Sequence, residues 1–261
     1  MIRRRPVVLM YHGFCPTPRA DDEFNLFVTV DSLRLQLDEL ARRGWHAITL
    51  DEYLAIRRGV RPMRPGSFLV TIDDGYQSVL ELGWPILRAA GIQPVLFVLP
   101  DLVGGGAKWM DAAAGEALLA WEQLRQLADE GVELGVHGLD HTVLTESSPS
   151  DLRRHIVDAR VQLEHHTGRR ARTFAYPEGR WDAAVRHAVI DAGYEVGFSV
   201  HNGHDRWTVA RIDVTARDTP TSFRLKLVPG YRTWWRVAGR LGGLRPLVNR
   251  IALRRRDDRS G

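Results

Sequence analysis

The stretch Phe68–Tyr76, which reads FLVTIDDGY, indicates how this chain folds. An apolar run of strand-forming residues ends in two adjacent carboxylates and a glycine, the residue that tolerates tight turns best. Neighbouring carboxylates repel one another, so burial of Asp73 beside Asp74 requires a positive charge between them. Because α/β proteins build active sites at the carboxyl ends of parallel strands, this stretch predicts a metal site.

A second stretch offers further metal ligands. Val132–Val136 has the composition of another buried strand, and two histidines four residues apart, His137 and His141, follow it. In a helical turn such a pair lies on one face and can bind one ion. One aspartate and two histidines leave coordination positions open for water and substrate, as catalytic metal sites require. The two stretches together predict a catalytic metal centre.

Strand-like and helix-like segments alternate along the chain, which is typical of a parallel β/α architecture. Besides the two stretches above, strands are expected at Pro6–Met10, Trp45–Leu50, Pro94–Leu99 and Tyr194–Val200. A short strand with a sharp Pro/Gly turn is expected within Thr173–Gly179, and Cys15–Asp22 is expected to be a loop. Helices are expected at Val30–Arg43, Asp51–Arg57, Ser78–Ala90, Trp121–Glu130, Ser150–Thr167 (with Ser150 as N-cap) and Asp182–Ala192. At 261 residues the chain is long enough for one large α/β domain with a substantial core.

The single cysteine and the lack of a long apolar segment bear on where in the cell the protein is expected. Cys15 is the single cysteine, so an intrachain disulfide framework is excluded. The apolar run Val7–Met10 is too short for the core of a secretion signal, and no window approaches the roughly 20 apolar residues of a membrane span. We therefore expect a cytoplasmic protein.

Positive charge is concentrated at the C-terminus. From Pro220 onward the chain has eleven Arg or Lys residues against two Asp, a segment charge of +9 in a protein of net charge +4, so the remainder carries 4 − 9 = −5. We expect a catalytic domain at 1–219 and a basic C-terminal extension at 220–261. Its interleaved apolar residues suit either peripheral contact with an anionic membrane or a terminal helix packed on the domain. Nucleic-acid binding is not expected, because no recognition motif accompanies the charge.

The motifs resemble those of the polysaccharide deacetylases, carbohydrate esterase family four. The resemblance covers roughly residues 6–215 and includes, in the family's order, TIDDG at 71–75, HxxxH at 137–141 and FAYPxG at 174–179. The chain is most similar to the subgroup whose first strand ends in Tyr-His, here Tyr11-His12. The resemblance implies an irregular (β/α) barrel, a single domain, and a metal-dependent hydrolase that removes N-acetyl groups from amino sugars.

The family's site residues transfer to matching positions of this chain. The resemblance implies that Asp74, His137 and His141 hold a divalent ion, most often zinc, with cobalt or nickel as alternatives. Asp73 would be the general base that takes a proton from water. A backbone N–H in the third motif, at Glu178, would stabilise the charge that develops on the substrate oxygen.

Two catalytic roles depend on departures from the common pattern. The usual late histidine motif for the general acid is absent, so the subgroup implies His12 as the acid, with His201 as the alternative and His204 near it. The third motif often begins with an arginine that orients the base, and Ala175 stands in its place here. Arg211 follows a late loop, as a basic residue does in the subgroup that this chain resembles, and the resemblance implies that it contacts Asp73 instead; the alternative is a surface arginine.

Substrate contacts are expected from aromatic side chains near the motifs. Tyr176 and Trp181 are the first candidates to bind a sugar ring, with Trp109 and Trp121 behind them. Glu178 replaces a frequent tyrosine and makes this part of the site more acidic. We expect an N-acetylated sugar in a glycan or in a lipid- or nucleotide-linked precursor. Two alternatives stay open: a hydrolase of a non-carbohydrate amide, and a non-catalytic sugar-binding relative.

Overall fold

Short apolar segments form the parallel strands that the sequence predicts. The computed structural model describes residues 5–109, 116–200, 203, 205–228 and 231. The two longest strands are β1 (Val7–Tyr11) and β5 (Ser67–Ile72), which pair in parallel along their length. Every residue of β5 is buried, as expected for a strand that is covered on both faces. This strand delivers the Asp73-Asp74 pair.

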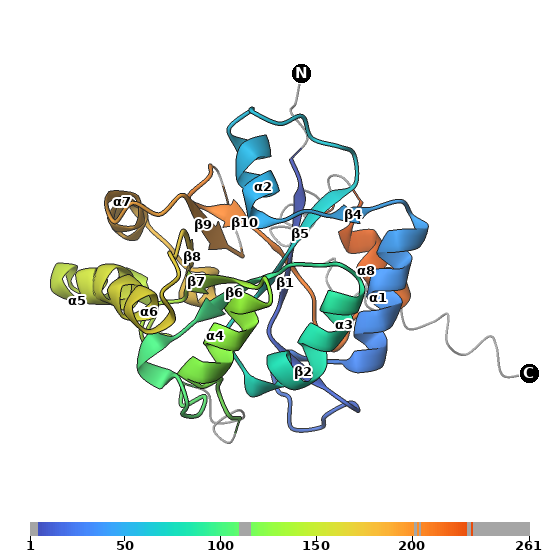
Figure 1. The fold of residues 1–261 in the computed structure, drawn as a ribbon, viewed down its shortest axis with the longest axis horizontal. Helices are drawn as coiled ribbons and strands as arrows, with labels where there is room; N and C mark the ends of the chain where they lie inside the picture. Colours follow the sequence, from blue (N-terminus) through green and yellow to red (C-terminus); the bar gives the residue numbers. More distant parts are fainter. Residues whose placement is uncertain (1–4, 110–115, 201–202, 204, 229–230, 232–261) are drawn as a thin grey trace, which may run out of the picture. The chain divides into compact units, whose positions relative to one another are not determined.

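The remaining strands extend this pair on both sides (Figure 1). The strand order is β10-β9-β8-β7-β6-β5-β1-β11, β4 pairs with β5 off this path, and all pairings are parallel. The further strands are β4 (His46–Ala47), β6 (Val95–Val98), β7 (Glu133–Val136), β8 (Thr173–Ala175), β9 (Val196–Ser199), β10 (Val209–Ala210) and β11 (Ile212–Asp213). The carboxyl ends of these strands consequently lie at one edge of the sheet.

One interrupted segment closes the sheet into a barrel. β10 pairs with β9, and β11 pairs with β1 at the opposite end of the strand order. Only Arg211 separates β10 from β11, so a single stretch of chain passes from one edge of the sheet to the other. The predicted irregular (β/α) barrel is confirmed.

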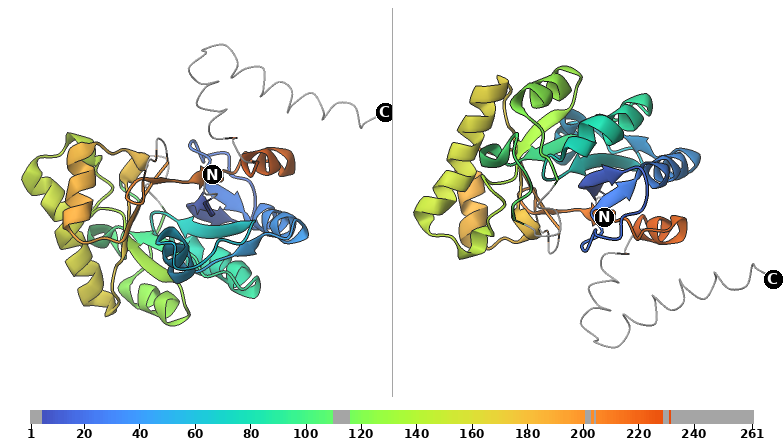
Figure 2. Two further views of the ribbon diagram at one scale, coloured as in Figure 1. Left: turned by 90° about the horizontal axis from the view of Figure 1, so that it is seen from above. Right: turned by 90° about the horizontal axis from the view of Figure 1, so that it is seen from below.

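Helices surround the barrel (Figures 1 and 2). They are α1 (Val30–Arg42), α3 (Trp84–Ala89), α4 (Trp121–Asp129), α5 (Pro149–Arg153), α6 (Ala159–Thr167) and α7 (Ala183–Asp191). Two π turns interrupt this pattern, η1 (Val79–Gly83) before α3 and η5 (Arg154–Asp158) between α5 and α6. Short 3-10 turns lie at η2 (Pro100–Leu102), η4 (Leu144–Glu146) and η6 (Pro177–Gly179).

Capping residues explain where the structure departs from the predicted boundaries. The strand expected at 45–50 shrinks to β4, because Thr49 and Glu52 form a capping box that begins α2 (Leu50–Arg57). The N-cap of α5 is Ser148 rather than Ser150, since its side chain accepts the N–H of Asp151. The segment expected to be a loop from Cys15 begins one residue later, because Cys15 is the last residue of β2 (Gly13–Cys15), which pairs with β3 (Phe27–Thr29).

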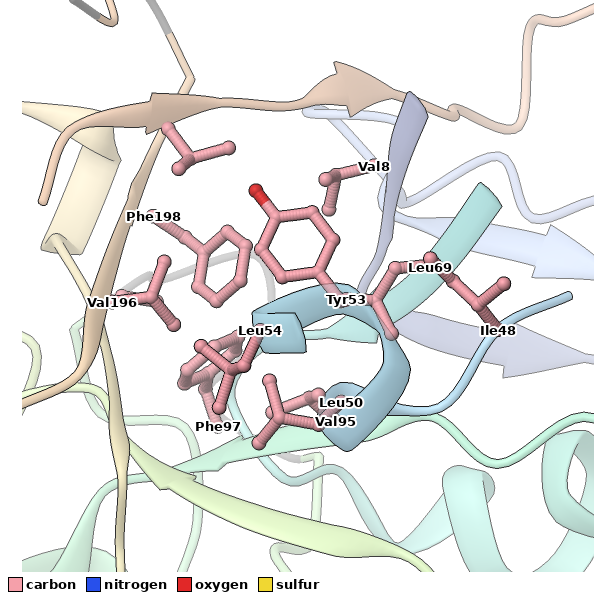
Figure 3. Close-up of a cluster of buried hydrophobic side chains, with 12 residues drawn as sticks. Val8, Ile48, Leu50, Tyr53, Leu54, Leu69, Val95, Phe97, Val196 and Phe198 are labelled. Carbon is pink, nitrogen blue, oxygen red and sulfur yellow. The ribbon is translucent and has the colours of Figure 1, made fainter. Parts of the chain in front are cut away.

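The core of the barrel is filled partly by α2 (Figure 3). Leu50, Tyr53 and Leu54 of this helix lie among apolar side chains from the strands. The strand residues include Val8, Val95 and Val196, which stand first or second in β1, β6 and β9. The helix thus closes the interior of the barrel toward the amino ends of the strands. The candidate functional groups at the carboxyl ends consequently lie on the other side of a packed apolar core.

The chain divides into two compact units, Met1–Ala216 and Arg217–Gly261. The second contains α8 (Pro220–Lys226), whose N-cap Thr219 accepts the N–H of Ser222. No helix within the described ranges is long and apolar enough to cross a membrane. Most of the basic extension predicted at 220–261 lies outside the described residues, so membrane contact through it, like the cytoplasmic location and the domain boundary, stays a prediction.

Candidate metal site and its surroundings

The turn after β5 holds the two aspartates in an unusual conformation. The N–H of Asp73 continues the strand ladder by donating to the carbonyl of Tyr11 at 2.9 Å. Asp74 then adopts a left-handed backbone with φ of 74°, followed by Gly75 at 77°. A non-glycine residue in this region costs roughly 1–3 kcal/mol and is found where surrounding contacts impose it, often at functional sites. Both aspartates are buried.

The histidines do not lie on a helical turn, and that expectation is wrong. His137 directly follows β7, and the segment 137–141 is neither helix nor strand. Gly138 and His141 have φ values of 81° and 72°, so the right-handed helical path is broken at both. The two rings nevertheless meet edge to face, 5.1 Å between centroids. An irregular loop brings them together where the sequence suggested a helix.

Three ligand atoms converge at this point. One atom each from Asp74, His137 and His141 lies within 4.8 Å of the other two. The Asp74 Oδ1 atom is 3.5 Å from His137 Nε2 and 3.6 Å from His141 Nε2. It is buried and has no hydrogen-bond partner among the described residues. A carboxylate oxygen left without a partner between two imidazole nitrogens fits a divalent cation with nitrogen and oxygen ligands.

The protonation states suit such an ion. His137 Nδ1 lies 2.8 Å from the carbonyl oxygen of Ala175, to which only a protonated nitrogen can donate, and this contact leaves Nε2 as the ring nitrogen that faces Asp74. Burial lowers the pKa of His141 to about 4, a shift that His137 and His12 reinforce and Asp74 opposes. His141 is therefore neutral near pH 7, and the neutral imidazole is the form that binds metal.

Arg211 forms a two-pronged ion pair with Asp73, as predicted. Its Nη1 and Nη2 atoms donate to Asp73 Oδ1 and Oδ2 at 2.6 and 2.7 Å, and both side chains are buried. Burial raises the pKa of Asp73, but the positive charge of Arg211 and the neighbouring His137 outweigh it and lower the pKa to about 2. The Asp73 carboxylate lies 3.9 Å from His137 Nε2, beside the cluster of ligand atoms rather than in it.

His12 lies at the carboxyl end of β1, directly after Tyr11. Its side chain is partly buried, and its Nδ1 atom has no hydrogen-bond partner in the described part of the chain. It contributes to lowering the pKa of both Asp73 and His141, so it lies near the same group of side chains. The alternative acid His201, and His204 near it, lie outside the described residues.

The three predicted substrate residues occupy different environments. Tyr176 is fully buried, its hydroxyl donates to the carbonyl of Trp207 at 2.7 Å, and its ring packs against Phe174. With no ring face open to a sugar, the expected stacking contact of Tyr176 is not supported. Glu178 is exposed, with φ of 54° and a carboxylate 3.8 Å from Arg180. Trp181 is partly exposed, and its sugar contact stays a prediction.

Two aromatic residues lie next to the candidate metal ligands, and the sequence did not predict this placement. The Trp109 ring stacks on the His141 imidazole at 4.9 Å with an interplanar angle of 14°. Tyr76 is buried next to Trp109, and burial together with Asp74 raises its pKa well above the ordinary range, so the phenol stays neutral. Trp121 stacks instead on His166, a residue of α6. No local pattern announces these pairs, because their partners are distant in sequence.

Comparison with known proteins identifies the family. The sequence pattern of the polysaccharide deacetylases matches residues 61–197, more than half of the chain, so the chain belongs to the polysaccharide deacetylase family. It is 22% identical over 197 residues to YxkH of Bacillus subtilis (strain 168), which is named for the same family, covering 75% of this chain and 64% of YxkH. It is 29% identical over 131 residues to the poly-beta-1,6-N-acetyl-D-glucosamine N-deacetylase of Escherichia coli (strain K12), covering 45% of this chain and 18% of that protein. The chain thus spans less than two thirds of the length of either relative.

Solved structures share the fold. The deacetylase PplD of Streptococcus pyogenes, in complex with acetate, superposes with a TM-score of 0.73 at 19% identity and covers 87% of this chain and 100% of its own. IcaB from Ammonifex degensii superposes with a TM-score of 0.70 at 25% identity, covering 84% and 94% respectively. These similarities agree with the barrel fold.

Proposed function

We propose that this protein is a metal-dependent hydrolase that removes an N-acetyl group from an amino sugar of a glycan or glycan precursor. The observation that carries the proposal is the juxtaposition of two groups: the Asp74, His137 and His141 cluster, and an Asp73 carboxylate held beside it by Arg211. A binding protein has no need of a base next to a metal site. Membership of the polysaccharide deacetylase family supports an acylated sugar as the substrate.

Asp74, His137 and His141 would hold the ion. A set of one carboxylate and two imidazoles favours zinc, and cobalt or nickel suit the same ligands. A divalent ion bound there supplies a Lewis acid, which makes water acidic near neutral pH and polarises a carbonyl oxygen. The stacked Trp109 ring and the His137–Ala175 hydrogen bond would keep the two imidazoles oriented toward it.

Asp73 would act as the general base. Its carboxylate lies next to the ligand cluster without belonging to it, so it is free to take a proton from the attacking water. Arg211 donates one hydrogen bond to each carboxylate oxygen of Asp73, which fixes the orientation of the base and keeps it ionised. The cost is a weaker base, since the pKa of Asp73 is lowered.

His12 would act as the general acid and donate a proton to the amine nitrogen that leaves. Its Nδ1, which has no hydrogen-bond partner among the described residues, and its proximity to Asp73 and His141 support this role, and His201 stays the alternative. The backbone N–H of Glu178 would donate to the substrate oxygen as negative charge develops there. The third motif is joined to the metal cluster through Ala175, whose carbonyl accepts from His137, and this contact supports that assignment.

The substrate we favour contains N-acetylglucosamine, since the Escherichia coli relative is named as a deacetylase of a polymer of that sugar. Trp181 and the carboxylate of Glu178 would contact the sugar near the third motif. Polymer and lipid- or nucleotide-linked precursors all present the same N-acetyl group, so they belong together in one substrate panel.

The deciding experiment measures metal content and acetate release for the wild type, Asp73→Asn and Asp205→Asn. Asp205 is the matched control, because it is also paired with an arginine, Arg186, in a partly exposed position. Substrates are N-acetylglucosamine oligomers and lipid- and nucleotide-linked N-acetyl sugars. We expect all three proteins to bind a metal, and only Asp73→Asn to lose acetate release.

Other outcomes separate the alternatives. Bound metal without acetate from any sugar, but with hydrolysis of another amide, would indicate a non-carbohydrate substrate. Sugar binding without hydrolysis of any amide would indicate a non-catalytic relative. If the wild type binds no metal after incubation with zinc, cobalt or nickel, the proposal is refuted.

A further inference from the structure

The loop that carries His141 adopts a conformation that its own sequence does not favour. Gly138 and His141 both have left-handed backbones, and for a histidine this costs roughly 1–2 kcal/mol. Between His137 and His141 the chain has no helical or strand hydrogen bonding to hold it. Contacts from other parts of the fold must therefore impose the position of the second histidine.

Two backbone contacts hold the middle of this loop at Leu139. Its carbonyl accepts the N–H of Asp101, from η2, at 3.1 Å. Its N–H donates to the Nδ1 atom of His155 at 3.3 Å. A backbone N–H can only donate, so Nδ1 must act as the acceptor. The carboxylate of Asp140, which accepts from the N–H and hydroxyl of Thr142, also lies 3.6 Å from the same Nδ1 atom, so His155 meets this loop at two neighbouring residues.

The position of His155 in its helix favours this contact. It belongs to the π turn η5, between α5 and α6, and π turns re-aim side chains and occur frequently at functional sites. The preceding residues Arg153 and Arg154 are exposed, whereas His155 is only 5% exposed. A polar ring is thus buried against the loop, and its one described hydrogen bond goes to that loop.

We propose that His155 is a positioning residue of the metal site. By accepting the N–H of Leu139, its Nδ1 atom holds the loop in the conformation that brings His141 to His137 and Asp74. The proposal rests on the proposed function, since it assigns His155 to the same site. Outer partners of this kind typically change metal affinity by 10–100-fold, because they pre-organise the ligands. His155 acts through the loop and takes no part in the reaction itself.

The test compares three substitutions in the full chain. His155→Leu has similar bulk but no acceptor, and His155→Asn places an amide oxygen where Nδ1 was. His46→Leu is the control, because the His46 ring is partly buried and, like that of His155, hydrogen-bonded, in this case to Ser67 at the amino end of β5. The zinc dissociation constant is measured by competition with a chelating dye, and hydrogen exchange of the Leu139 amide is measured in the ion-free protein.

We expect His155→Leu to bind zinc at least about 10-fold more weakly and to lose protection of the Leu139 amide. His155→Asn should stay within about threefold of the wild type, and His46→Leu should match it. Equal affinity for the wild type and His155→Leu would overturn the proposal and leave the function intact. Equal weakness of the Leu and Asn variants would overturn the acceptor role.

Two further outcomes are decisive. If the wild type binds no zinc, the proposed function fails, and the role of His155 fails with it. If His155→Leu does not fold, His155→Gln replaces it, because its longer side chain carries the amide past the Nδ1 position. The His155→Gln variant is then expected to bind zinc more weakly than the His155→Asn variant, and equal zinc affinity of the two would refute the proposal.

Discussion

Replacing Arg211 by methionine should destabilise the protein in a pH-dependent way. The substitution keeps much of the bulk but removes both hydrogen bonds to Asp73, at 2.6 and 2.7 Å. Breaking a buried ion pair by removing one partner costs about 3–5 kcal/mol, because the other charge stays buried. Of this, the shift of the Asp73 pKa from 3.8 to about 2 corresponds to roughly 2–3 kcal/mol.

The sign of the pH effect follows from the direction of each shift. In the wild type the folded-state pKa of Asp73 lies below the unfolded value, so its stabilisation is complete above the unfolded pKa and is lost as the pH falls through about 2. In Arg211→Met, burial is no longer opposed by the guanidinium, and the pKa of Asp73 rises above its ordinary value. The variant is then penalised most at neutral pH, and the penalty shrinks as the pH falls.

The assay is urea unfolding of the ion-free wild type and Arg211→Met at pH 7.5 and pH 5. The gap in unfolding free energy should be about 3–5 kcal/mol at pH 7.5 and smaller at pH 5 by roughly 1 kcal/mol. Arg186→Met is the control, since its pair with Asp205 is partly exposed and should cost about 0–1 kcal/mol at either pH. An Arg211→Met variant as stable as the wild type, or a gap that is equal at both pH values, would refute the reasoning.

Three further results are expected. Gly138→Ala forces a side chain into a left-handed backbone position, so it should lower the free energy of unfolding in urea by about 1–2 kcal/mol and weaken zinc binding. The control Gly91→Ala has a similar φ and open space around the added carbon, so it should cost the same stability and leave zinc affinity unchanged. Loss of zinc affinity in both variants would contradict this prediction. Zinc at 100 times its dissociation constant should raise the stability of the wild type by about 2.7 kcal/mol in thermal unfolding. An equal gain in His141→Ala would show that His141 is not a zinc ligand. Tyr176→Phe removes the hydrogen bond to the carbonyl of Trp207, so it should lower the free energy of unfolding by about 1 kcal/mol and leave KM unchanged. A raised KM would instead indicate that Tyr176 contacts the sugar.

Much of the site could be predicted because it is local in sequence. Asp73 and Asp74 directly follow β5, and His137 directly follows β7. In a parallel barrel all carboxyl ends lie at one edge, so residues that end strands meet there even when the strand order is unknown. Apolar runs with turn residues at both ends were enough to place these strands and the candidate residues that follow them, and the family resemblance then supplied the expected roles of metal ligand and base.

Burial of individual side chains was harder to predict. Strands that are covered on both faces read as continuous apolar runs, so the sequence does not tell which residues point inward. Tyr176 follows the fully buried strand β8 and was expected to face a sugar, yet its ring is in the core. The conformation of the 137–141 loop was missed for a related reason: the spacing of two histidines is compatible with a helix, and only contacts with other segments exclude it.

The sequence by itself determined the parallel β/α class, the residues that end the strands, and the kind of ion that they suit. These properties depend on neighbours in the chain, because strand propensity, turn residues and side-chain chemistry act locally. The family resemblance suggested that Arg211 contacts Asp73, but only the tertiary structure decided how: Arg211 lies where the barrel closes between β10 and β11, next to the end of β5. It likewise decided that Trp109 and His155 support the loop of His141. Such pairs form when distant segments pack together, and the energy that selects them is spread over the whole barrel.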